Sequence, residues 1–174
     1  LKGDVQKLMK GAQRLGLEGL IGKRADSVYE AGRRGGAWIK LKLRSEQEMV
    51  IGGFTNPEGS RRHFGALVVG YNKKDHLLCA GKVGTRFNES LLKSLSKKFE
   101  SLLTASCPFA NLPEKKAGRY GAGITDGELR RCHWLTQKLG CQVKFSEWTR
   151  DGKLRQPVFL GLRADKKADE VVRE

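Results

Sequence analysis

The fold is decided by residues 48–84, EMVIGGFTNPEGSRRHFGALVVGYNKKDHLLCAGKVG. Three apolar runs, 48–54, 64–71 and 76–84, are separated by Asn-Pro-Glu-Gly and Asn-Lys-Lys-Asp, which are typical turn sequences. The pattern predicts three consecutive strands joined by turns. Working outward from this stretch, the strands should form the first half of a β domain.

A helix and more strands follow this stretch. Leucines and phenylalanines recur at helical spacing along residues 89–103, and Asn88 suits the N-cap. Residues 105–130 are rich in Pro, Gly and charge, so they are expected to form a loop. The runs CHWLT, QVKFSEWT and LRQPVFLGLR then supply two or three strands, with Asp151-Gly152 as a hairpin turn. This order predicts a mainly β protein with a five-stranded Greek-key barrel and one helix, the OB-fold; a different small barrel or an α+β sandwich is the alternative.

The first 44 residues show a different pattern from the β-rich remainder of the chain. Residues 4–16 carry apolar residues at helical spacing and end at Gly16, which predicts a helix. A short apolar strand is expected at 17–24, followed by a basic, turn-rich loop at 25–37 and a strand at 38–43.

The strand at 38–43, WIKLKL, alternates strictly. Its apolar face, Ile39, Leu41 and Leu43, is expected to be core. The opposite face holds Trp38, Lys40 and Lys42, with the two ammonium groups about 6.5–7 Å apart, a spacing suited to successive phosphates. A half-solvated strand with its lysines in water is the alternative.

Glu18 stands within the apolar run 17–24. A buried carboxylate is costly unless a cation or a metal neutralises it, so Lys23, Lys40, Lys42 or a divalent ion are its expected partners. Exposure at the start of the strand is the alternative. Glu18 and Lys23 have opposite parity, so Lys23 is expected to join the same site only through a bulge or beyond the end of the strand.

The 174 residues carry a formal net charge of +15, with 34 basic and 19 acidic side chains. This charge favours a polyanionic partner such as nucleic acid over a merely lysine-rich surface. Four scattered cysteines without a Cys-x-x-Cys pair indicate reduced thiols rather than zinc. No apolar run approaches the ~18–20 residues of a membrane span, which argues against an integral membrane protein. No signal peptide is visible in the sequence.

Three ordered motifs carry a family resemblance. EGLIGK (18–23), WIKLK (38–42) and RQPVFLGLRADK (155–166) resemble motifs IV, V and VI of ATP-dependent DNA ligases. The longer strings VIGGFTNPEGSRRHFGALVVG, AGKVGT and FSEWTRDGKLRQPVFLGLRADK resemble the DNA ligase D branch, the prokaryotic end-joining enzymes. The resemblance covers nearly the whole chain from residue 4.

The resemblance implies a division of the chain and a chemistry. Residues 1–44 would be the end of a nucleotidyltransferase (adenylation) domain, 45–46 the hinge and 47–174 the OB domain. Such ligases carry AMP on a lysine, pass it from ATP to the 5′-phosphate of a nick, and release it when the 3′-hydroxyl attacks. The family's nucleophilic lysine lies in a K-x-D-G motif, which this chain lacks, so it is expected upstream.

The resemblance also implies roles for residues. Glu18 would help to hold Mg²⁺ or Mn²⁺, Lys40 and Lys42 would lie near the AMP phosphate, and Lys23 and Trp38 would help to bind the nucleotide. Arg163, Asp165 and Lys166 would orient the pyrophosphate leaving group. Gln156 replaces an expected His in the last motif. The candidate DNA-binding residues are Arg33, Arg34, Arg61, Arg62, Lys82 and Arg86.

The implied cofactor is ATP. The implied partners are nicked or broken double-stranded DNA, the remainder of the ligase and the end-binding protein Ku, in the cytoplasm of a prokaryote, close to its nucleoid. Two rival functions stay open. One is another covalent nucleotidyltransferase, such as an RNA ligase or a capping guanylyltransferase. The other is a non-catalytic OB module that only binds DNA.

Overall fold

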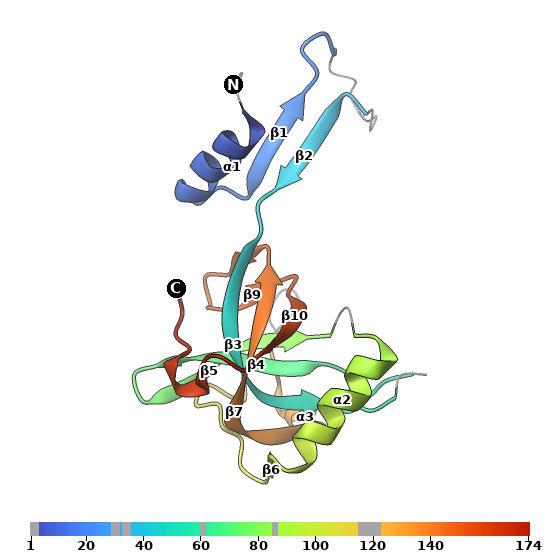
Figure 1. Cartoon of the computed structure of the whole chain (residues 1–174), viewed down its shortest axis with the longest axis vertical. Helices are drawn as coiled ribbons and strands as arrows, with labels where there is room; N and C mark the ends of the chain where they lie inside the picture. Colours follow the sequence, from blue (N-terminus) through green and yellow to red (C-terminus); the bar gives the residue numbers. More distant parts are fainter. Residues whose placement is uncertain (1–3, 29–31, 33–35, 60–61, 85–86, 115–122) are drawn as a thin grey trace. The chain divides into compact units, whose positions relative to one another are not determined.

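Figure 1 shows the computed structural model of the chain, which describes residues 4–28, 32, 36–59, 62–84, 87–114 and 123–174. The chain forms two compact units, Leu1–Ser45 and Glu46–Glu174. No described helix is long and apolar enough to cross a membrane.

The smaller unit contains α1 (Val5–Arg14), β1 (Gly19–Lys23) and β2 (Trp38–Lys42). Asp4 caps α1 by accepting a hydrogen bond from the Gln6 N–H at 2.8 Å. Gly16 ends the helical segment in the left-handed region, with φ of 66°, a conformation that glycine adopts readily. β1 and β2 are antiparallel, so the predicted helix and both predicted strands are confirmed, each with slightly shorter bounds.

The prediction of a core face on the second strand is wrong for Ile39. This side chain is 59% exposed, whereas Leu41 and Leu43 are half-buried. Among the residues described in this unit, Ala12 is the one buried side chain. One helix against two strands offers too little apolar surface to enclose a core.

The larger unit is built on five principal strands: β3 (Ser45–Thr55), β4 (Leu67–Lys73), β5 (His76–Val83), β7 (Cys132–Phe145) and β10 (Val158–Arg163). Their order in the sheet is β10-β7-β3-β4-β5. Three consecutive antiparallel strands are thus followed by one that returns beside the first. This is the predicted Greek-key order of the OB-fold, and the fold prediction is confirmed.

The helix α2 (Glu89–Glu100) lies between β5 and β7 in the chain. Asn88 caps it by accepting from the Leu91 N–H at 2.8 Å, as predicted. Its buried residues join the barrel core, which includes Leu92, Leu95, Phe99, Met49, Ile51, Phe64, Leu67 and Val69. The helix was expected to reach Leu103, but that residue begins β6 (Leu103–Thr104), which pairs with β7 and is 53% exposed at Leu103.

The segment expected to be a loop, 105–130, covers part of the sheet. Phe109 and Ile124 pack in a second apolar cluster, whose other buried members are Val50, Val68, Leu77, Cys79, Trp134, Ala168 and Val171. A Cβ at Gly52 or Gly70 would collide with the Phe109 ring, so both positions require glycine for this close approach. The segment also contains the short helix α3 (Asp126–Leu129), which the prediction missed.

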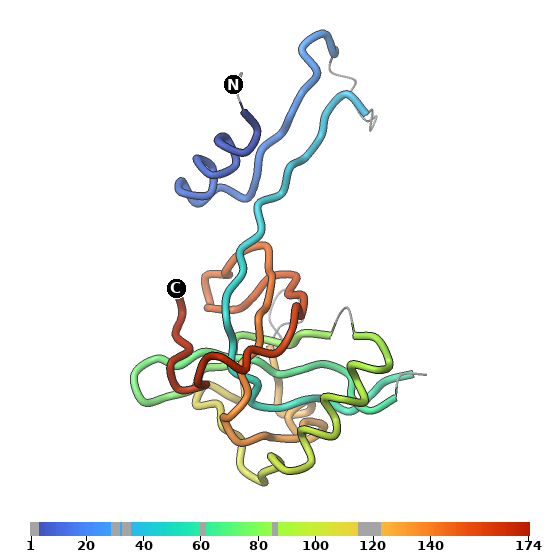
Figure 2. The backbone as a smooth tube through the Cα atoms, in the orientation of Figure 1, coloured from blue at the N-terminus to red at the C-terminus, as the bar shows by residue number. Residues whose placement is uncertain are grey.

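The last described segment packs on the same face of the sheet, because Ala168 and Val171 belong to the cluster that contains Phe109; Figure 2 traces its backbone to the C-terminus. Asn72 on β4 donates through its Nδ2 to the Ala168 carbonyl at 2.7 Å, and its N–H donates to the Val171 carbonyl at 2.8 Å. The 3-10 helix η1 (Ala168–Glu170) is fixed there. The outer face of β3, β4 and β5 is therefore filled by apolar side chains rather than left open.

The runs CHWLT, QVKFSEWT and LRQPVFLGLR were expected to supply two or three strands. Cys132–Phe145 is one continuous strand that joins the first run to part of the second, and the polar residues between the two runs lie exposed on it. Asp151-Gly152 does form a turn, between β8 (Glu147–Trp148) and β9 (Leu154–Arg155), with Gly152 at φ of 74°.

Candidate functional site

The first candidate site is the polar face of the strand pair in the smaller unit. Lys23 lies directly opposite Trp38 in the antiparallel register, so their side chains share one face with Lys40 and Lys42. The Lys23 Nζ lies 3.9 Å from the centre of the Trp38 ring, and the Trp38 Nε1 donates to the Ser27 Oγ at 3.2 Å. Strand pairing thus gathers three ammonium groups and an indole on one surface.

The expectation that Glu18 lies inside a buried strand is wrong. β1 begins at Gly19, and the Glu18 side chain is 61% exposed. Its Oε2 lies 3.5 Å from the Lys40 Nζ, so the lysine on β2 is its cationic partner. Lys23 was expected to need a bulge, or a position beyond the strand end, to share a site with Glu18. β1 is regular from Gly19 to Lys23, and Glu18 precedes the strand, so Lys23 reaches the Trp38 face without a bulge. A Cβ at Gly19 would collide with the Leu41 carbonyl oxygen, and the close pairing therefore needs glycine.

The surroundings of Glu18 show whether the described residues could bind a divalent cation there. Glu18 offers one carboxylate, and among the described residues no three His, Cys, Asp or Glu side chains converge on a metal position. Hard cations such as Mg²⁺ take about six oxygen ligands. The described residues therefore do not form a metal site by themselves, and Glu18 could supply one ligand of a larger set.

The second candidate site lies at the end of β10 in the larger unit. Arg163 and Asp165 form a bidentate pair, with Nε–Oδ1 and Nη2–Oδ2 distances of 2.8 and 2.7 Å. The hydrogen bonds from Arg163 lower the pKa of the Asp165 carboxyl to about 2, and the same bonds raise the pKa of Arg163. This pair is therefore fully charged at neutral pH.

Two residues that the sequence did not single out complete this cluster. Glu48 on β3 forms an ion pair with Arg163, its Oε1 lying 3.0 Å from Nη1, and accepts a hydrogen bond from Lys166 Nζ at 3.2 Å through Oε2. Gln142 on β7 accepts from Arg163 Nη1 at 3.0 Å. Glu48 lies 115 and 118 positions from its two partners, so only the sheet order β10-β7-β3 brings them together.

Gln156, which replaces the expected His, has a strained backbone. It is a non-glycine residue with φ of 52°, and its side-chain oxygen accepts from the Ser146 hydroxyl at 3.1 Å. It therefore fixes the bend between β9 and β10, immediately before the strand that carries Arg163.

The predicted DNA-binding residues are only partly within the described chain. Arg33, Arg34, Arg61 and Arg86 lie outside the described residues. Arg62 is exposed in the β3–β4 connection. Lys82 on β5 forms an ion pair with Glu128; although partial burial alone would raise the pKa of Glu128, the hydrogen bond from Lys82 lowers it. Lys82 is thus partly neutralised in this state.

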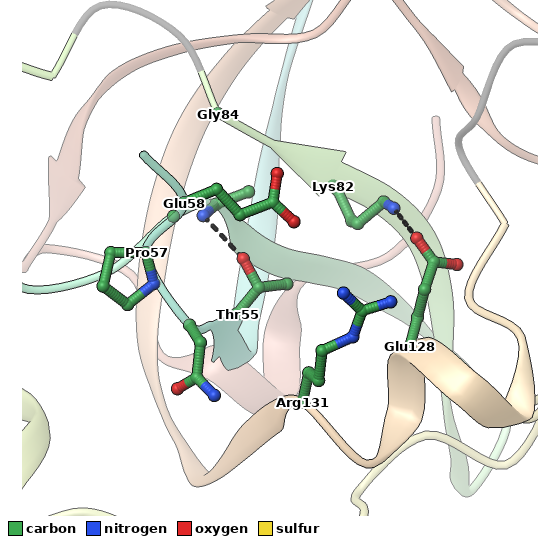
Figure 3. A pocket seen from close by; sticks show the side chains of 10 residues that line it. Thr55, Pro57, Glu58, Lys82, Gly84, Glu128 and Arg131 are labelled. Atoms are coloured by element: carbon green, nitrogen blue, oxygen red, sulfur yellow. Dashed lines mark hydrogen bonds and ion pairs between the residues drawn. The ribbon is translucent and has the colours of Figure 1, made fainter. Parts of the chain in front are cut away.

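A cavity of about 490 Å³ opens beside Lys82. It is lined by the residues around the β3–β4 connection, the end of β5 and α3: Thr55, Asn56, Pro57, Glu58, Gly65, Ala66, Lys82, Gly84, Glu128 and Arg131. Figure 3 shows the Arg131 side chain pointing into the cavity. The sequence did not single out Arg131, which lies between the expected loop at 105–130 and the run that begins at Cys132, where no local pattern marks it as part of a site.

Comparison with protein families assigns both units. Residues 60–166 match the ATP dependent DNA ligase C terminal region, and residues 2–42 match the ATP dependent DNA ligase domain. The chain is similar to the multifunctional non-homologous end joining protein LigD of Pseudomonas aeruginosa, at 42% identity over 177 residues, covering 100% of this chain and 20% of that protein. The corresponding protein of Mycolicibacterium smegmatis is 41% identical, covering 100% and 22%. The chain thus spans about a fifth of the length of these relatives.

Solved structures agree with these matches. The ligase domain of M. tuberculosis LigD superimposes with a TM-score of 0.66 at 37% identity, covering 100% of this chain and 53% of that one. A mycobacterial DNA ligase D complexed with ATP and MES gives a TM-score of 0.62 at 35% identity, covering 100% and 52%.

Proposed function

The chain belongs to the ATP-dependent DNA ligases, and we propose that it is the C-terminal part of the ligase domain of an enzyme that seals DNA breaks by the ligase D route. Residues 1–44 are then the end of the adenylation domain, 45–46 the hinge and 47–174 the OB domain. Relatives similar to this chain are named for non-homologous end joining, which supports broken double-stranded DNA as the substrate. The end-binding protein Ku is the partner proposed with it.

The observation that carries this proposal is the charged face of the strand pair. Lys40 and Lys42 stand on one side of β2 with Trp38, and Lys23, which lies opposite Trp38 on β1, shares this face. Strands hold these groups in place before a ligand arrives, and phosphoryl transfer is accelerated chiefly by charges held in place in this way. This face suits a nucleotide, with the indole against the base or sugar and the ammonium groups against the phosphate.

The chemistry begins with an upstream lysine. Its amine attacks the α-phosphorus of ATP, a P–N bond forms, the α–β P–O bond breaks, pyrophosphate leaves and the amine proton goes to solvent. Lys40 and Lys42 neutralise charge on the AMP phosphate in this step and in the two that follow. The cluster of Arg163, Asp165 and Lys166 acts only in this first step, where it orients the departing pyrophosphate. A bound Mg²⁺ or Mn²⁺ would supply further charge neutralisation, with Glu18 as one of its ligands.

DNA contact is proposed at the rim of the barrel rather than on the covered outer face of β3, β4 and β5. Arg62, Lys82 and Arg131 lie around the cavity or in the connection beside it. This end of an OB barrel, at the connection between its first two strands, is a usual place for nucleic acid. Arg33, Arg34, Arg61 and Arg86 remain candidates for the same role.

The experiment compares two activities of the complete protein. Lys42→Ala should lose both ATP-dependent sealing and sealing of a chemically pre-adenylated nick, by about 2–4 kcal/mol of barrier if the lysine acts like one preorganised donor. Lys166→Ala should lose only the ATP-dependent reaction. Equal loss of both activities in both variants would refute the division of labour between the two sites.

A second function is favoured by one observation: the 174 residues contain no K-x-D-G lysine. By itself, the chain would then be a DNA-binding module without ligase activity. A nick-sealing assay set beside a nick-binding assay separates the two functions, since the module binds nicked DNA and seals none.

A further inference from the structure

Glu48 is the acidic centre of the cluster at the end of β10. Its side chain is 16% exposed, less than any of the charged groups it contacts. One carboxylate oxygen contacts Arg163 at 3.0 Å and the other contacts Lys166 at 3.2 Å. A single carboxylate on the central strand β3 therefore holds two cations that lie next to each other on the surface.

Arg163 and Lys166 differ in how many of their N–H donors are already used within the protein. Arg163 uses one edge of its guanidinium for Asp165, at 2.8 and 2.7 Å, and its Nη1 for Gln142 and Glu48, both at 3.0 Å. Lys166 has three donors, and its contact among the described residues is Glu48. Arg163 is thus engaged on both sides, whereas Lys166 keeps donors for a phosphate oxygen.

Glu48 also reduces the electrostatic repulsion between Arg163 and Lys166. Without a carboxylate between them, Arg163 and Lys166 would repel each other, and the flexible lysine stem would carry its ammonium group into solvent. With Glu48 and Asp165 the cluster holds two positive and two negative groups. The cluster therefore holds the Arg163 and Lys166 side chains in fixed positions and has no net positive charge.

We propose that Glu48 is a positioning residue for self-adenylation: it holds Lys166 beside the engaged Arg163 so that the ammonium group meets the departing pyrophosphate. This rests on the proposed function above. Within the motif, Lys166 is then the group that touches pyrophosphate, while Arg163 forms the scaffold that locks Glu48 in place.

The test uses the complete ligase with Glu48→Gln, which keeps the shape and removes the charge, and Glu48→Asp, which keeps the charge. The measurements are the single-turnover rate of ligase–AMP formation from ATP, its reversal by pyrophosphate, and sealing of a pre-adenylated nick. Displacing one phosphate-binding group by about 1 Å can cost up to about 100-fold, so E48Q should slow formation and reversal by roughly 10–100-fold. Sealing of the pre-adenylated nick should be unchanged, and E48D should recover part of the loss.

Glu89→Gln is the control. Glu89 is an exposed carboxylate in the first turn of α2, outside the cluster around Glu48. This variant should adenylate like the unaltered enzyme. In the double variant E48Q/K166A, the loss should not exceed that of K166A alone, because Glu48 acts through Lys166.

Two results would overturn the assignment. E48Q could form ligase–AMP at the unaltered rate, which would leave Glu48 without a role in this step. It could instead lose adenylation and pre-adenylated sealing in equal proportion, which would make Glu48 a structural residue of the barrel. If the unaltered complete protein formed no adduct with ATP, the proposed function itself would be wrong, and that outcome is distinct from both.

Discussion

Truncation of Lys153 should be among the most destabilising single changes in this chain. Lys153 lies in the β8–β9 turn, its side chain is 4% exposed, and its Nζ donates to the Cys79 carbonyl at 2.8 Å. The same ammonium forms an ion pair with Glu114, whose side chain is 18% exposed. The pair ties the hairpin before β10 to the segment that covers the outer face of the sheet.

The magnitude follows from what Lys153→Ala leaves behind. The Glu114 Oε1 is buried and makes no described hydrogen bond to replace the ammonium group. Removing one partner of a buried ion pair costs about 3–5 kcal/mol, because the other charge stays buried without compensation. For a chain of this size that corresponds to a fall in Tm of roughly 6–20 °C.

The assay is guanidinium or urea unfolding of the 174-residue chain, with the slope of the transition checked for constancy. Lys144→Ala is the control, since Lys144 and Glu46 are 35% and 44% exposed and their pair should contribute at most about 1 kcal/mol. The double variant K153M/E114L should return to within about 1 kcal/mol of the unaltered chain, because apolar groups can replace a buried pair. A loss below about 1 kcal/mol for K153A would refute the reasoning that the pair is buried and uncompensated.

Three further outcomes are expected. The isolated chain should take no label from α-labelled ATP, because it has no K-x-D-G lysine; an acid-labile protein–AMP adduct would mean that another lysine is the nucleophile. Binding to nicked duplex should weaken steeply with salt, log K falling by roughly 0.7–0.9 per phosphate neutralised for each tenfold rise, and an affinity independent of salt would contradict the role assigned to the +15 charge. Because the pKa of Asp165 is lowered to about 2, its contribution to stability should be complete above the unfolded value near ~4 and lost as the pH falls through about 2. Unfolding of D165N should therefore differ from that of the unaltered chain at pH 7 and coincide with it at the lowest pH reached.

Local patterns in the sequence predicted most of the elements. Alternation along 38–43 placed Trp38, Lys40 and Lys42 on one face, and the pairing of β1 with β2 confirms it. Asn88 caps α2 as predicted, and the three apolar runs within residues 48–84 form β3, β4 and β5. These features depend on spacing within a few residues, where backbone geometry alone decides which side chains share a face.

Local sequence patterns did not predict burial where it depended on the exact start of a strand or on a distant segment. Glu18 stands in an apolar run yet lies exposed, because the strand begins one residue later. The stretch 105–130, rich in Pro, Gly and charge, was expected to be a loop, and nothing in its pattern indicated that Phe109 and Ile124 pack on the outer face of the sheet. Composition reports an average over a segment, whereas covering a sheet takes only a few well-placed apolar side chains.

The family, the barrel and the cations of the last motif could therefore be recognised from the sequence by itself, since ordered motifs and strand periodicity are local properties. The tertiary structure alone decided which distant carboxylates meet the cations of the last motif and of the β8–β9 turn. Glu48 reaches Lys166 across 118 positions, and Glu114 reaches Lys153, because the Greek-key order places β3 beside β7 and folds 105–114 onto the sheet. A charge acts over a few ångströms in space regardless of separation along the chain, so its partner is set by topology.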